Sequence, residues 1–122
     1  MTTLFISDLH LEDSRPDISR WLMAFLDGPA RSATDVYILG DLFEAWIGDD
    51  ALSETARRVA VAMRRLSESG VNCFFMHGNR DFLLGESYAH EAGLILLPEA
   101  VVIDLYGEPT LLLHGDSSVS YT

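Results

Sequence analysis

The stretch "LFISDLHLED", residues 4–13, decides the fold, because an apolar run ends within it and is followed at once by polar side chains. Residues 4–6 form the apolar run, and Asp8 and His10 follow it with a single residue between them. A short apolar run bounded by polar residues is typical of a buried strand. We therefore expect a strand whose end presents a carboxylate and an imidazole.

Two further apolar runs, at 36–39 and 71–76, predict buried strands of the same kind. Between the three runs, apolar residues recur at helical spacing over residues 16–26 and 52–66. The order strand, helix, strand, helix, strand requires crossover connections, which place the strands side by side in the same direction. The fold class is therefore predicted to be α/β with a mainly parallel sheet.

The rest of the chain predicts shorter elements. A helix over residues 87–92 ends at a glycine, and the strands 101–105 and 110–113 flank a turn and form a hairpin. Asp49 and Asp50 are expected at the N-cap of the helix over 52–66.

Four of the predicted strands, at 4–6, 36–39, 71–76 and 110–113, are followed by residues able to bind a metal ion: Asp8, His10, Asp41, Asn79 and His114. In open α/β sheets, ligands gather beyond the carboxyl ends of the strands, so these side chains are expected to converge. Oxygen donors mixed with imidazole nitrogen suit Mn²⁺, Zn²⁺ or Fe²⁺ better than Ca²⁺. An aspartate after a strand is, taken singly, more often a turn former than a ligand. The repetition at four strand ends favours a metal site.

The neighbouring residues favour phosphate as the ligand of that site. A carboxylate such as Asp41 can bridge two ions, and two ions roughly 3.5–4 Å apart can hold a phosphate during an in-line displacement. Gly40, Gly78 and Gly115 allow the backbone to turn tightly beside an anion. The guanidinium of Arg80 is a planar donor suited to phosphate oxygens.

Other residues with reactive or aromatic side chains have structural interpretations. His77 precedes a glycine turn and is expected to be a structural histidine, and His90 is expected on the surface. Cys73 lies between apolar residues and is expected to pack in the core. For Trp46 and Phe82 two interpretations stay open, the core or an apolar wall beside the site.

Composition limits the classes of function. The 122 residues carry a formal net charge of −11, and all eight basic residues are arginines. This balance disfavours a binder of duplex nucleic acid, which needs a basic surface. A single cysteine excludes an internal disulfide and is compatible with the cytoplasm. No run approaches a membrane span, no basic leader is visible, and no linker divides the chain, so residues 1–122 are expected to form one domain.

The pattern D-x-H, G-D, G-N, H-G resembles the calcineurin-like metallophosphoesterases. In this sequence it is carried by Asp8-Leu9-His10, Gly40-Asp41, Gly78-Asn79 and His114-Gly115. The general family usually has histidine after the asparagine, where this chain has Arg80. The stretches "ILGDLFEAWIGDD" (38–50) and "HGNRDFLLG" (77–85) resemble, more specifically, the UDP-2,3-diacylglucosamine pyrophosphohydrolases of lipid A biosynthesis. The resemblance runs from Thr3 to about Asp116.

This resemblance implies a role for each matching residue. Asp8 and His10 would bind one Mn²⁺ ion, Asn79 and His114 would bind a second, and Asp41 would bridge them. Asp41, Asn79 and His114 would form the catalytic set, and Asn79 and Arg80 would contact the substrate. The implied reaction hydrolyses the pyrophosphate bond of UDP-2,3-diacylglucosamine to UMP and 2,3-diacylglucosamine 1-phosphate (lipid X). Such enzymes act in the cytoplasm, peripherally on the cytoplasmic face of the inner membrane.

One departure from the family is large. The family has a further half with an acyl-binding cap and a late G-H-x-H motif, and this sequence contains no such motif. Residues 1–122 are therefore expected to be the N-terminal half of an αββα sandwich, with apolar surface left uncovered. Two alternatives stay open: a truncated, catalytically inactive metal-binding remnant, and a different metallophosphoesterase acting on nucleotides or protein phosphate. The 38–50 stretch argues against the second.

Overall fold

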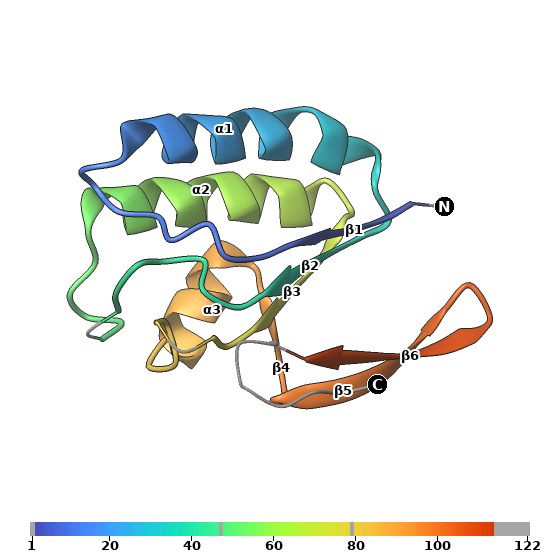
Figure 1. Cartoon of the computed structure of the whole chain (residues 1–122). Coiled ribbons are helices and arrows are strands. Elements are labelled where there is room, and N and C mark those ends of the chain that lie inside the picture. The colour runs from blue at the N-terminus through green and yellow to red at the C-terminus, as the bar shows by residue number, and fades with distance from the viewer. Residues whose placement is uncertain (1, 47, 79, 114–122) are drawn as a thin grey trace.

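A computed structural model describes residues 2–46, 48–78 and 80–113 of the chain (Figure 1). Its parallel sheet has the order β1-β2-β3-β4, with the strands β1 (Thr3–Ile6), β2 (Asp35–Leu39), β3 (Asn72–Met76) and β4 (Ile95–Leu97). Its helices are α1 (Pro16–Asp27), the short 3₁₀ helix η1 (Pro29–Ser32), α2 (Glu54–Glu68) and α3 (Glu86–Ala92). An antiparallel hairpin follows, made of β5 (Ala100–Leu105) and β6 (Glu108–Leu113). The predicted class, α/β with a mainly parallel sheet and a C-terminal hairpin, is confirmed.

The sheet separates two apolar layers. In Figure 1, α1 and α2 lie above the parallel strands and the hairpin lies below them. Side chains alternate along β2, so Val36 and Ile38 join the core beneath the helices, whereas Tyr37 faces the hairpin and packs with Leu112. Parallel pairing places Val36 opposite Leu4 and Cys73, so β1, β2 and β3 end at the same edge of the sheet. This register positions the loops that carry the polar residues.

The N-cap of α2 differs from the prediction. Ser53 is the N-cap, and its hydroxyl accepts a hydrogen bond from the N–H of Ala56 at 3.0 Å. The assignment of Asp49 and Asp50 to this cap was therefore wrong. Asp49 instead lies beside the first turn of α3, where its carboxylate accepts hydrogen bonds from the N–H groups of Gly85 (2.9 Å) and Tyr88 (3.0 Å). It joins the loop after β2 to a helix that begins more than thirty residues later.

Replacing Asp49 with asparagine is expected to lower stability by about 1 kcal/mol at pH 7, because the amide has one acceptor oxygen where the carboxylate uses two, and one hydrogen bond contributes about that much. Burial opposes ionisation of Asp49, but hydrogen bonds from Tyr88, Gly85 and the Trp46 indole outweigh it and hold its pKa below the ordinary 3.8. A lowered pKa stabilises the fold above the unfolded value and loses that effect as pH falls through the folded value. Urea unfolding should therefore show a full difference above about pH 4 that shrinks at pH 3. A difference independent of pH, or equal to that of the exposed control Asp50→Asn, would contradict this.

The hairpin turn is shorter than predicted. Tyr106 and Gly107 both have positive φ, 53° and 91°, which is the pattern of a two-residue type I′ turn. Pro109 lies within β6, paired with Asp104, so the expected connection over 106–109 was too long. β4 was not predicted as a strand, because three residues are too few to show a pattern.

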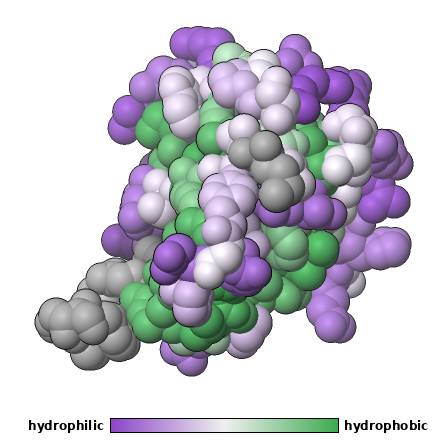
Figure 2. Space-filling view, turned by 90° about the vertical axis from the view of Figure 1, so that its right-hand side faces the viewer, coloured by the Kyte–Doolittle hydropathy of each residue, from purple (hydrophilic) through white to green (hydrophobic). Residues whose placement is uncertain are grey.

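Apolar side chains remain exposed on the hairpin side of the molecule. Val102 and Leu111 are 61% and 52% exposed, and Ile95 is 50% exposed. Figure 2, turned so that the right-hand side of Figure 1 faces the viewer, shows the most continuous apolar surface in its lower part, on the side of the hairpin. Such a surface agrees with the expectation of an uncovered apolar face. No helix among the described residues is long and apolar enough to cross a membrane.

Candidate metal centre

Three of the five expected metal ligands lie together at the carboxyl edge of the sheet. Each of Asp8, His10 and Asp41 offers a ligand atom within 4.8 Å of the others. Asp8 is exposed, His10 is half-buried, and Asp41 is only 6% exposed. The other two expected ligands, Asn79 and His114, lie outside the described residues. The ends of β1 and β2 therefore supply one candidate centre, as strand-end residues of a parallel sheet should.

The backbone at this cluster is left-handed. Asp8, His10 and Asp41 have φ values of 56°, 51° and 51°, a region that non-glycine residues rarely adopt. Each such residue costs of the order of 1 kcal/mol, and strain of this kind concentrates at functional sites. Backbone hydrogen bonds hold the conformation, from Asp8 N–H to the carbonyl of Gly40 (3.1 Å) and from His10 N–H to the carbonyl of Asp41 (3.0 Å). The two loops thus continue the pairing of β1 and β2 beyond the strands.

Asp81 fixes the loop that carries Asp41, and sequence reasoning missed it. Asp81 is fully buried, and its carboxylate accepts from the N–H groups of Leu42 (2.8 Å), Gly78 (2.9 Å), Asp41 (3.3 Å) and Phe43 (3.3 Å). One carboxylate thereby joins the loop after β2 to the loop after β3. The only signal in the sequence was a further acidic residue in the turn after β3.

Gly78 lets the loop after β3 approach Asp41 closely. A Cβ added at this glycine would collide with the backbone nitrogen and the Oδ1 atom of Asp41. The N–H of Arg80, two residues on, donates to the same Oδ1 at 2.8 Å. Gly78 was predicted to let the backbone turn tightly beside an anion, and the structure shows a steric requirement for glycine at its contact with Asp41.

Glu44 is a second residue that sequence reasoning missed. Its Oε1 lies 3.1 Å from Nδ1 of His10 and 3.8 Å from a terminal nitrogen of Arg80. The Arg80 side chain is 58% exposed, so its guanidinium lies at the open rim of the cluster. The structure thus places Arg80, the expected phosphate ligand, on the same side as His10.

Residues with structural interpretations behave as expected. His77 Nε2 contacts the carbonyl of Leu84, and His90 is exposed. Burial raises the pKa of the Cys73 thiol to about 11, as for a packing residue. Trp46 is buried against Phe43 and Tyr88, which settles its open interpretation in favour of the core. Phe82, in contrast, is 65% exposed and belongs to no core cluster of the described residues.

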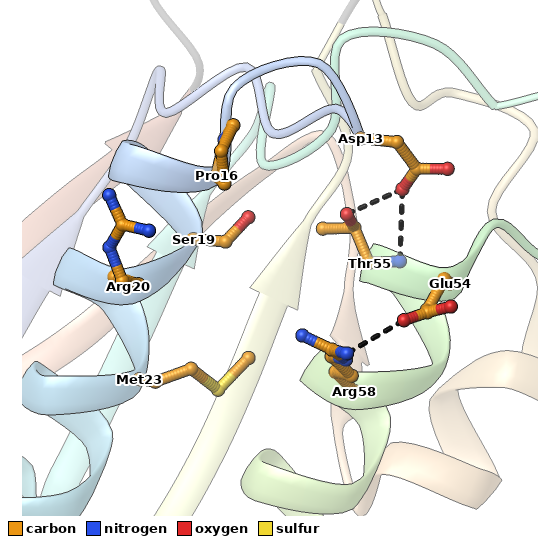
Figure 3. Close-up of a pocket in the computed structure, with 8 residues that line it drawn as sticks. All are labelled: Asp13, Pro16, Ser19, Arg20, Met23, Glu54, Thr55 and Arg58. Atoms are coloured by element: carbon orange, nitrogen blue, oxygen red, sulfur yellow. Dashed lines mark hydrogen bonds and ion pairs between the residues drawn. The ribbon is translucent and has the colours of Figure 1, made fainter.

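The loop that carries Asp8 and His10 is anchored at its far end beside a pocket between α1 and α2 (Figure 3). The carboxylate of Asp13 accepts hydrogen bonds from the hydroxyl (2.6 Å) and the N–H (3.1 Å) of Thr55, and these bonds hold the pKa of Asp13 below its ordinary value. The pocket, of about 410 Å³, is lined by α1, α2 and this loop, and none of the three clustered ligands lines it. The pocket is therefore separate from the candidate centre.

The donor set suits a divalent cation. Two carboxylates and an imidazole provide the mixed oxygen and nitrogen donors that Mn²⁺, Fe²⁺ and Zn²⁺ accept. Bringing Asp8 and Asp41 together is unfavourable without a counter-charge, and a cation between them would provide one. The residues present thus fit a metal ion.

Comparison with known proteins adds a family and a set of relatives. The model for the calcineurin-like phosphoesterase family matches residues 1–122. A "UDP-2,3-diacylglucosamine hydrolase" of Pseudomonas aeruginosa (strain UCBPP-PA14) is 57% identical over 117 residues, which cover 96% of this chain and 49% of that protein. The protein of the same name from Stenotrophomonas maltophilia (strain K279a) is 61% identical over 116 residues, 95% of this chain and 47% of its own length. The chain therefore spans about half the length of the curated relatives it matches.

Proposed function

The chain belongs to the calcineurin-like phosphoesterase family, and from this membership we propose that it forms the N-terminal half of a metal-dependent hydrolase. The substrate proposed is UDP-2,3-diacylglucosamine, cleaved at its pyrophosphate bond to UMP and 2,3-diacylglucosamine 1-phosphate. The relatives that carry this substrate in their name support the choice, since they are 57–61% identical over nearly the whole chain. In this proposal residues 1–122 belong to one metallophosphoesterase domain, whose second half is the additional length of the relatives.

The observation that carries the proposal is the cluster of Asp8, His10 and Asp41. Asp8 and His10 would hold one Mn²⁺ ion, and Asp41 would bridge to a second. Asn79 and His114, which lie outside the described residues, are the proposed ligands of that second ion. The bound ions would activate water and stabilise the negative charge that develops on the oxygens around phosphorus.

The chain's own residues would orient the substrate. Arg80 lies at the rim of the cluster, where its guanidinium could donate to two phosphate oxygens in a bidentate contact. Asn79 is proposed as a second contact to the same phosphate. The tight approach of Gly78 to Asp41 leaves no room for a side chain between the loops, which keeps the bridging carboxylate in place. We place the reaction at the cytoplasmic face of the inner membrane, because a diacylated substrate resides in a membrane.

Replacing Asp41 with asparagine is expected to weaken Mn²⁺ binding more than about tenfold. Substitutions of residues that only contact a metal ligand lower metal affinity about 10–100-fold, and Asp41 is itself a proposed ligand. Asparagine tolerates the left-handed backbone of this position, so the change removes charge while the fold is kept. Isothermal titration with Mn²⁺ and release of UMP from UDP-2,3-diacylglucosamine would be measured on the same preparations. The exposed Asp50→Asn variant is the matched control.

The outcomes separate the alternatives. Release of UMP that disappears in Asp41→Asn supports the hydrolase. Mn²⁺ binding without release, in a chain folded by circular dichroism, would support the catalytically inactive metal-binding remnant. Mn²⁺ binding that is equal in wild type and Asp41→Asn would contradict both.

A further inference from the structure

We propose that Glu44 is a positioning residue, which fixes the imidazole of His10 in one tautomer and holds Arg80 beside the same centre. The inference rests on the proposed function only in treating His10 as a metal ligand. Glu44 itself is not a member of the cluster in which Asp8, His10 and Asp41 lie within 4.8 Å of one another. Glu44 would influence the metal site through its contact with His10 and would not bind the ion itself.

The contact between Glu44 and His10 determines which ring nitrogen carries the proton. Glu44 Oε1 lies 3.1 Å from Nδ1 of His10. An ionised carboxylate can only accept a hydrogen bond, so Nδ1 must be the donor. In the neutral imidazole the lone pair is thereby left on Nε2, the nitrogen that lies 3.9 Å from Oδ1 of Asp8. The free lone pair thus faces the side on which the other ligands lie, as a metal-binding imidazole requires.

The backbone places Glu44 for this contact. The N–H of Glu44 donates to the carbonyl of Leu11 at 2.9 Å, and Leu11 forms an isolated parallel bridge with Phe43. Leu11 and Phe43 are both about 2% exposed, so the pairing is anchored in the core. Glu44 and His10 therefore sit on two loops that are joined in register. The side chains of both residues are 38% exposed, which leaves them accessible to a ligand.

The same oxygen of Glu44 faces Arg80. Oε1 lies 3.8 Å from a terminal guanidinium nitrogen, and the Arg80 side chain is more exposed than that of Glu44. An exposed ion pair of this length contributes little to stability, so its proposed effect is limited to favouring the orientations of Arg80 that lie near Glu44. The N–H of Arg80 donates to Asp41 Oδ1. The backbone of Arg80 is therefore held by the cluster, and its guanidinium lies beside Glu44. Glu44 therefore connects a proposed metal ligand to the proposed phosphate ligand.

The first test reads the tautomer directly in the metal-free 122-residue chain. Two-dimensional ¹⁵N NMR of the imidazole rings distinguishes Nδ1–H from Nε2–H, and the His10 signals are assigned by their loss in His10→Gln. We expect the Nδ1–H form in wild type. We expect this preference to be lost in Glu44→Ala and retained in Glu44→Gln, whose amide oxygen can still accept from Nδ1. The exposed control Glu99→Gln should leave the tautomer unchanged.

The second test measures Mn²⁺ affinity on the same set of variants. Glu44→Ala should weaken binding by about 10–100-fold, Glu44→Gln by less, and Glu99→Gln not at all. An Nε2–H tautomer in wild type, or a tautomer preference that survives in Glu44→Ala, would overturn the proposal without any need for a variant to bind metal. If wild type keeps the Nδ1–H form but binds no Mn²⁺, the proposed function fails while the positioning contact stands.

Discussion

Replacing Asp81 with alanine is expected to destabilise the fold by about 3–5 kcal/mol, because the buried carboxylate accepts four backbone N–H groups. Two of these bonds are short, to Leu42 at 2.8 Å and to Gly78 at 2.9 Å. Hydrogen bonds to a charged acceptor contribute about 1.5–3 kcal/mol each, and buried N–H groups left without a partner lose the compensation for their desolvation. Most of the loss is therefore expected from these two donors.

Urea unfolding followed by tryptophan fluorescence measures this loss, since Trp46 is buried near the same loop. Asp17→Ala is the matched control, because its carboxylate pairs with Arg15 on the surface and should contribute little to stability. Asp81→Asn keeps one acceptor oxygen and should fall between the two. A loss below about 1 kcal/mol in Asp81→Ala would show that the four N–H groups find other partners.

Replacing Gly78 with alanine is expected to have the second large effect, on both stability and metal binding. The new methyl group would collide with the backbone nitrogen and Oδ1 of Asp41, and its distance to Cγ would be only 2.8 Å. Neither the backbone nor a carboxylate held by the Arg80 N–H can move aside freely. Overpacking of this kind costs about 3 kcal/mol at the upper end of its usual range. Because the displaced group is the proposed bridging ligand, Mn²⁺ binding should fall at least as far as in Asp41→Asn.

Gly107→Ala separates this steric effect from the general cost of replacing a glycine. Gly107 has φ of 91° and nothing within 4 Å of an added Cβ, so only backbone strain of about 1 kcal/mol is expected there. Metal binding should be unchanged in Gly107→Ala. Equal losses of stability in the two variants, with Mn²⁺ affinity intact in Gly78→Ala, would contradict the steric explanation.

Much of the fold could be predicted because its signals are local. The strands around Ile38 and Phe75 are continuous apolar runs, and the face of α2 that includes Val59 repeats at helical spacing. β4 was missed because a strand of three residues is too short to show an alternation of apolar and polar side chains. The length of the hairpin turn was not predicted correctly, because it depends on left-handed backbone at Tyr106 and a tyrosine rarely adopts that conformation.

The candidate site was predictable in part for the same reason. Asp8, His10 and Asp41 could be found because each follows a strand, and parallel strands end at one edge. Glu44 and Asp81 could not, because Glu44 contacts a residue 34 positions away and Asp81 binds a loop about 40 positions away. In a chain with 19 acidic residues, their sequence signal is the same as that of a solvated surface acid. Supporting contacts of this kind depend on the tertiary structure.

The left-handed backbone at Asp8, His10 and Asp41 links the stability of the chain to the proposed metal site. Glycine would adopt these conformations without strain, so a glycine at any of the three positions would relieve backbone strain and remove a proposed ligand. These positions instead carry an imidazole and two carboxylates, and each of the three residues lowers the stability of the fold through its backbone strain. Under the proposed function, the backbone strain at these positions is the loss of stability that accompanies the placing of the three ligands.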